Sequence, residues 1–102
     1  MAQPTAHGIM FLGAIMATKH DEISALTLVS QFPGATIFVL KEDSKRTDRI
    51  TITIKGGAAL SSTPQVSYPL EYNEATAFDG VTNLKYIFNR DCKIAIGKVI
   101  TA

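Results

Sequence analysis

Hydrophobic and polar residues alternate most regularly over residues 50–55, which have the sequence ITITIK. A period of two residues is typical of a β-strand with one face against a core and the other in solvent. The pattern therefore predicts that the isoleucines of this strand are buried and that its threonines are exposed. The buried set is Ile50, Ile52 and Ile54, and the exposed set is Thr51 and Thr53.

A second apolar run, residues 36–40 (TIFVL), has large hydrophobic side chains at consecutive positions rather than at every second one. Apolar residues on both faces are typical of a central strand that is covered on both sides. Residues 41–49 carry charges of both signs and link this run to strand 50–55. The simplest arrangement pairs the two strands antiparallel through this charged loop.

Residues 84–88 and 93–100 predict a second antiparallel hairpin, which turns at residues 89–91. Isoleucines, Ile94, Ile96 and Ile100, share one face of the second strand, whereas Ala95 and Gly97 present small atoms on the other. A face of small residues is typical of a place where another backbone or an aromatic ring comes close.

Residues 21–32 fit both a strand and a helix. As a strand the segment alternates, and the β-branched Thr27 and Val29 favour that form. As a helix it has an apolar stripe, an aspartate, Asp21, that would cap its start, and a Pro-Gly pair at 33–34 that would end it. We favour the strand and keep the helix as the alternative.

Residues 61–83 contain two prolines and few regular patterns. We expect a short strand at residues 65–68, followed by a long loop with one helical turn at residues 74–78. Loops of this length in a small domain are often functional or interface elements.

These elements predict an all-β fold, a small antiparallel sandwich or a partly open barrel of about six to seven strands. The alternative is an α+β fold with one helix at about residues 21–32. The 102 residues fit a single domain, 1–102, with an apolar N-terminal segment 1–18 and a long loop around 61–83. The composition, 46% hydrophobic and 19% charged, is that of a folded chain rather than a disordered one.

Residues 8–17 (GIMFLGAIMA) form an uncharged apolar run. A signal peptide would carry Lys or Arg ahead of such a run, and here only His7 precedes it. A membrane span needs about 20 apolar residues, roughly twice this length. We therefore expect no membrane partner and synthesis in the cytoplasm. The run is expected either to form a strand within its own domain or to pack as an arm on another subunit.

Candidate catalytic and metal-binding residues are few. The only histidines are His7 and His20, and consecutive residues of an extended chain, such as residues 20–22, point to opposite sides rather than at one ion. Cys92 is the only cysteine, so the chain forms no internal disulfide. Its neighbour Asp91 disfavours a reactive thiolate.

The remaining polar candidates also lack a catalytic context. Ser61 and Ser62 are not in a nucleophile-elbow sequence, and the glycines of residues 56–60 are not followed by the Gly-Lys-Ser/Thr of a phosphate loop. Glu71 and Glu74 are typical of solvated loop carboxylates. We expect a protein that is not an enzyme and that holds no cofactor and no metal ion.

Ten Lys and Arg residues against nine Asp and Glu give a net charge of +1, far from the basic excess of a dedicated nucleic-acid-binding protein. Residues 85–90 do mix basic and aromatic side chains, as a base-stacking strand does. Tyr86 and Phe88 share their face with Leu84, however, which is typical of a core face. Single-stranded nucleic-acid binding through strand 85–90 is therefore an alternative only.

The favoured function is that of a structural or interaction protein that self-associates or docks on a larger assembly. A small capsid-decorating or particle-assembly subunit of a virus is an example of this class. We expect the N-terminal segment to supply the interface through its large apolar side chains, Ile9, Met10, Phe11, Leu12, Ile15 and Met16. The alternative is a soluble β-barrel, either a ligand-binding protein or a small enzyme, with its pocket beneath residues 64–80.

Overall fold

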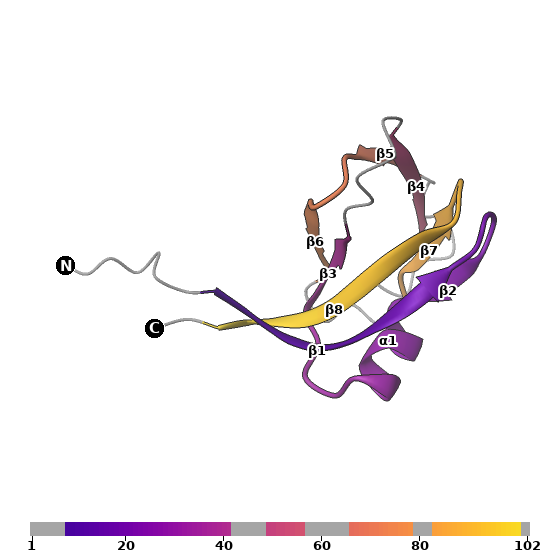
Figure 1. Ribbon diagram of the computed structural model, residues 1–102. Helices are drawn as coiled ribbons and strands as arrows, with labels where there is room; N and C mark the ends of the chain where they lie inside the picture. Colours follow the sequence, from indigo (N-terminus) through magenta and orange to yellow (C-terminus); the bar gives the residue numbers. More distant parts are fainter. Residues whose placement is uncertain (1–7, 42–48, 57–65, 79–82, 101–102) are drawn as a thin grey trace.

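The computed structural model describes residues 8–41, 49–56, 66–78 and 83–100. These residues form eight strands and one helix, arranged as two antiparallel four-stranded sheets that pack on each other (Figure 1). This confirms the predicted small antiparallel sandwich. The described strands do not close into a barrel, because each sheet ends in two edge strands.

The first sheet, which we name sheet A, contains the longest strands of the molecule. Its order is β1-β8-β3-β6, so that β1 and β6 are the edges. The strands are β1 Gly8–Ala17, β8 Cys92–Ile100, β3 Ile37–Leu40 and β6 Ala75–Ala77. All four residues of β3 are buried, which confirms the predicted central strand with both faces covered.

The second sheet, sheet B, has the order β2-β7-β4-β5, with β2 and β5 at its edges. The strands are β2 Glu22–Ser24, β7 Lys85–Phe88, β4 Ile50–Lys55 and β5 Val66–Leu70. Both predicted hairpins are therefore wrong, since β3 and β4 lie in different sheets and so do β7 and β8. An alternating pattern identifies the buried face of a strand but not its neighbour, and connections that cross between the sheets bring the apolar faces together.

Residues 21–32 form the short strand β2 and then the helix α1 (Ala25–Gln31), so the predicted strand is wrong beyond Ser24. Ser24, not Asp21, is the N-cap, and its hydroxyl oxygen accepts a hydrogen bond from the Thr27 N–H at 3.1 Å. This cap satisfies an N–H donor that the first turn of a helix leaves free. Its stabilisation of the helix outweighs the strand preference of the β-branched Thr27 and Val29. Leu28 of α1 is buried in the core between the sheets.

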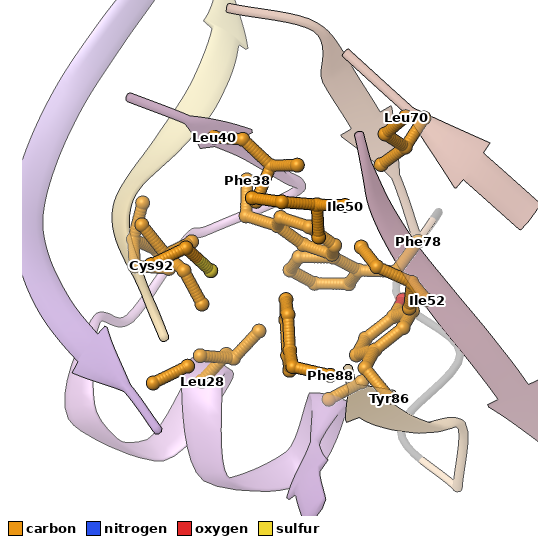
Figure 2. Close-up of a cluster of buried hydrophobic side chains, with 14 of the residues drawn as sticks. Leu28, Phe38, Leu40, Ile50, Ile52, Leu70, Phe78, Tyr86, Phe88 and Cys92 are labelled. Carbon is orange, nitrogen blue, oxygen red and sulfur yellow. The ribbon is translucent and has the colours of Figure 1, made fainter. Parts of the chain in front are cut away.

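The core between the two sheets is built on aromatic contacts (Figure 2). The ring of Phe38 in sheet A meets Tyr86 of sheet B edge-on, with 4.9 Å between their centroids, and lies 6.2 Å from Phe88. Ile50 and Ile52 are fully buried beside them, as predicted. The other residues of that prediction show a weaker alternation: Ile54, Thr51 and Thr53 are all half-buried.

The region around 61–83 is more regular than its sequence indicated. The predicted strand at 65–68 corresponds to β5, but the predicted helical turn at 74–78 is wrong, because β6 runs through it. A tight turn precedes β6: the Glu71 N–H donates to the Glu74 carboxylate at 2.8 Å, and Asn73 has a φ of 74°. Ser61, Ser62 and Gly80 lie outside the described residues.

Candidate interaction surface

The outer face of sheet A, the side away from sheet B, is apolar on all four strands apart from Lys93, the first outward residue of β8. Residues that lie opposite each other in neighbouring strands share a face of the sheet. Ile37 pairs with Gly97 of β8 and with Ala77 of β6. Val39 pairs with Ala95 of β8 and with Ala75 of β6. The outward residues of the three strands are Ile37, Val39, Ala75, Ala77, Lys93, Ala95, Gly97 and Val99.

These outward side chains form an apolar cluster of their own, separate from the core between the sheets. Ile37, Val39 and Ala95 are buried, and Ile9 of β1 packs against them. A small sandwich normally has one core, between its layers. Here the outer face of sheet A carries a second apolar cluster.

Gly97 allows β1 to approach this cluster closely. A Cβ atom on Gly97 would lie only 2.6 Å from Cγ2 of Ile9 and 3.5 Å from Cδ1 of Phe11. This confirms the close approach that the small residues of strand 93–100 predicted. The register of β1 on β8 shifts between Phe11 and Gly13, and this β-bulge re-aims the first part of β1.

The cluster borders a surface groove of about 590 Å³. Ile9, Phe11 and Val99 line one side of the groove, and Ala75 and Ala77 line the other. Every side chain that lines it is apolar. The two alanines come from the range 64–80, beneath which the alternative prediction placed a ligand pocket. The groove is open to the surface, unlike the interior of a ligand-binding barrel.

The outer end of the β1–β8 pair projects beyond the rest of sheet A (Figure 1). We name this part the arm, residues 8–11 and 97–100, since β8 has no β3 partner after Gly97. Its large apolar side chains are unusually accessible. Their exposed fractions are 45% for Met10, 53% for Phe11, 38% for Val99 and 43% for Ile100.

The structure divides the six predicted interface residues into three groups. Leu12 and Ile15 pack in part against the core between the sheets, and Ile9 packs against the outer cluster. Met10, Phe11 and Met16 are exposed, Met16 by 65%. Residues 8–17 therefore form a strand as predicted, but a strand only half covered by its own domain.

The sequence-based prediction missed the part of this surface that β3, β6 and β8 contribute. A usable signal was present in residues 36–40, whose large side chains occupy both faces of the strand. Among the described residues, charge lies at the rim of the surface, on Lys93 opposite Met16 and on Lys41. There Nζ of Lys41 lies 5.6 Å from the centre of the Phe11 ring, a cation–π distance, and the Lys41 N–H donates to the carbonyl of Lys93.

A polar pocket of about 400 Å³ lies at the turn between β7 and β8 and is lined by Lys19 and residues 89–91. Its side-chain oxygens hold the turn together: Asp91 accepts from the Lys19 N–H at 2.7 Å, and Asn89 accepts from the Thr51 N–H at 2.8 Å. These contacts give Asp91 and Asn89 a structural role.

The other chemical candidates are dispersed. The Glu71 carboxylate pairs with Arg49, and the Glu74 carboxylate accepts from the Glu71 N–H in the turn before β6, so the two carboxylates have separate partners. Cys92 is buried, and His20 is exposed. Within the described residues, no three His, Cys, Asp or Glu side chains are grouped as metal ligands. His7 lies outside them.

The candidate base-stacking strand directs its rings inward. Tyr86 and Phe88 are each 1% exposed and pack against Phe38, so their faces are not presented to a nucleic acid. Within β7 only Lys85 is exposed, and it lies beside Glu22.

Among the described residues, no helix has the length and apolar character that crossing a membrane requires. Comparisons with known protein families, with curated proteins and with solved structures find no match to this chain.

Proposed function

We propose that this protein is a non-enzymatic structural or interaction protein that self-associates through the outer face of sheet A and the arm. One observation carries the proposal: the outer face of sheet A is largely apolar, and its large side chains on β1 and at the end of β8, Phe11, Met16 and Val99, are exposed. An extended apolar surface of this kind on a small domain is typical of a protein–protein contact.

The energetic argument concerns the large side chains left in water. Phe11, Met16 and Val99 are each more than a third exposed. Full burial of side chains of this size stabilises by roughly 1.5 to 3 kcal/mol each, so covering several of them favours association. The methionine would also tolerate an imperfectly matched partner surface.

The proposal is tested by measuring mass in solution with light scattering, for the wild type and for two variants of matched design. Phe11→Glu places a charge on the outer face of sheet A, whereas Leu26→Glu places the same charge on α1. The two side chains are similarly exposed, 53% and 56%. We expect a wild-type oligomer that Phe11→Glu dissociates and Leu26→Glu preserves. A wild type that stays monomeric at high concentration would contradict the proposal.

The narrower expectation of a capsid-decorating or particle-assembly subunit requires such self-association and stays a prediction. Electron microscopy of the native source is the measurement that checks it, because a subunit of this kind is recovered in particles. Recovery of a soluble, particle-free monomer would favour the ligand-binding alternative instead.

A further inference from the structure

The direction of the backbone groups in β8 follows from one hydrogen bond to β3. The Lys41 N–H donates to the Lys93 carbonyl at 2.9 Å, so Lys93 directs its N–H and C=O toward β3. In an antiparallel sheet, successive residues direct these groups to opposite sides of the strand. Cys92 and Ile94 therefore direct theirs toward β1.

The same reasoning shows which groups of β1 face away from the sheet. Ala17 and Ile15 lie opposite Cys92 and Ile94, so they bond to β8. Met16 lies between them and Ala14 precedes them, so these two residues direct their N–H and C=O groups to the free edge. Within the described part of the chain, no hydrogen bond reaches these groups.

β1 differs from the other edge strands in the described residues. Natural proteins protect sheet edges by keeping them short or by placing charges or proline on them. β6 has three residues, β2 has three residues including Glu22, and β5 contains Pro69. β1 has ten residues with neither charge nor proline, and its bulge at residue 12 leaves residues 13–17 in regular register.

We propose that this free edge pairs antiparallel with β1 of a second copy of the chain, joining two sheets A into one continuous sheet. The inference rests on the proposed self-association and adds to the outer-face contact a second contact, along the edge of sheet A. Unpaired strand groups are satisfied by another strand. A two-fold axis beside Ile15 places Ala14 of one copy opposite Met16 of the other, where each pair exchanges N–H···O bonds.

Two features of β1 favour a second copy as the occupant. Two-fold pairing sets the strand against itself, and since β1 is uncharged from Gly8 to Ala17, no like charges meet across the axis. Ala14 and Met16 also direct their side chains to the outer face of sheet A. Pairing therefore continues the apolar outer face across the axis and covers Met16, the most exposed large hydrophobic residue of the described chain.

The test uses two proline variants of the full chain, one at the β1 edge of sheet A and one at the β5 edge of sheet B. Ala14→Pro removes an N–H that faces the free edge and leaves the bonds to β8 intact. Ser67→Pro is the matched control. The Asn89 N–H donates to the Thr51 carbonyl, so Thr51 and Thr53 bond to β7, and Ser67, which lies opposite Thr53, directs its N–H to the free edge of sheet B. We expect Ala14→Pro to raise the dissociation constant at least about tenfold and Ser67→Pro to leave it unchanged.

Hydrogen exchange of the Met16 amide distinguishes this inference from the proposed function. We expect this amide to be protected in the wild-type oligomer and to exchange rapidly in the Ala14→Pro monomer. An oligomer whose Met16 amide exchanges rapidly would overturn edge pairing while leaving self-association through the outer face in place. A monomeric wild type would overturn both.

If Ala14→Pro fails to fold by circular dichroism, Met16→Lys provides the second variant. Its side chain is largely exposed, so the substitution spares the core and adds an edge lysine of the kind that prevents strand pairing. We expect a folded monomer. A folded Met16→Lys variant that associates as tightly as the wild type would overturn the inference.

Discussion

The outer faces of the two sheets differ in chemistry although both sheets have four antiparallel strands. In sheet B the outward residues of the central strand β4 are Thr51 and Thr53, and both are half-buried. In sheet A the outward residues of the central strand β3 are Ile37 and Val39, and both are buried. The same architecture thus has one polar outer face and one apolar outer face.

The difference between the outer faces of β3 and β4 shows how the central strand of a sheet determines the number of layers that the fold requires. A sheet with one apolar face is complete in a two-layer sandwich, because the opposite sheet covers it. A sheet with two apolar faces needs a third layer. Sheet B, whose outer face carries Glu22 beside Lys85, needs none. On the outer face of sheet A, the described part of the chain leaves Phe11, Met16 and Val99 more than a third exposed.

The largest expected effect comes from the residue that joins the two sheets. Phe38→Ala removes the ring that meets Tyr86 edge-on and leaves a cavity in the shared core. We expect the free energy of unfolding to fall by about 3 to 5 kcal/mol, as measured by urea denaturation. Leu26→Ala, at an exposed position, serves as the control and should cost less than about 0.5 kcal/mol. Equal losses would mean that the sheets are not held together by this core.

The next largest effect on stability is expected from exchanging valine and threonine, which have similar shapes, between the two outer faces. Val39→Thr buries a hydroxyl in the outer cluster of sheet A, and we expect it to cost about 1 to 3 kcal/mol. The reverse change, Thr53→Val, lies on the half-exposed face of sheet B and should stay within about 0.5 kcal/mol. Thermal unfolding of both variants checks this. Similar costs on the two faces would remove the difference on which the comparison rests.

The face chemistry of each strand was predictable, whereas the pairing of strands was not. The alternation over residues 50–55 and the double-sided pattern of residues 36–40 both indicated which side chains are buried. Neither pattern carries information about partners, because any apolar face can pack on any other. The two strands therefore looked like a hairpin but lie in different sheets.

The helix within residues 21–32 was kept only as the alternative to a strand, for a different physical reason. Thr27 and Val29 lower helix propensity by only tenths of a kcal/mol, whereas an N-cap contributes about 1 kcal/mol. The cap is Ser24, and its hydroxyl meets both the N–H and the hydroxyl of Thr27. The candidate surface was predicted in part, since the sequence identified Met10, Phe11 and Met16, which the structure leaves exposed. The contributions of β3, β6 and β8 depend on strand order, which local sequence does not encode.

A smaller effect is expected from the charges on the outer face of sheet B. Oε1 of Glu22 lies 3.6 Å from Nζ of Lys85, and Oε2 lies 4.0 Å from Nζ of Lys55. All three side chains are more than a third exposed, so Glu22→Gln should lower stability by no more than about 1 kcal/mol at low salt. Added salt should shrink the difference, because it screens exposed pairs. A loss that is large and independent of salt would show that this face is not solvated.

The smallest expected effect lies at the corner where β1 of sheet A leads into β2 of sheet B. The Thr18 N–H donates to Oδ2 of Asp21 at 2.8 Å, and this hydrogen bond, made by Thr18, holds the pKa of the carboxyl below its ordinary value of 3.8. A lowered pKa in the folded state contributes stability above the ordinary value, and that contribution is lost as the pH falls through the lowered one. Asp21→Asn removes the titration but keeps an oxygen that accepts from Thr18.

We therefore expect the wild type to be slightly more stable than Asp21→Asn at about pH 6, and the difference to shrink below about pH 3.8. Urea unfolding of both proteins at the two pH values measures it. A stability gap that widens as the pH falls would contradict the assigned hydrogen bond. Self-association should be the same in both proteins. Asp21 lies in the connection between β1 and β2 and not on the outer face of sheet A, so its substitution leaves the proposed contact surface unchanged.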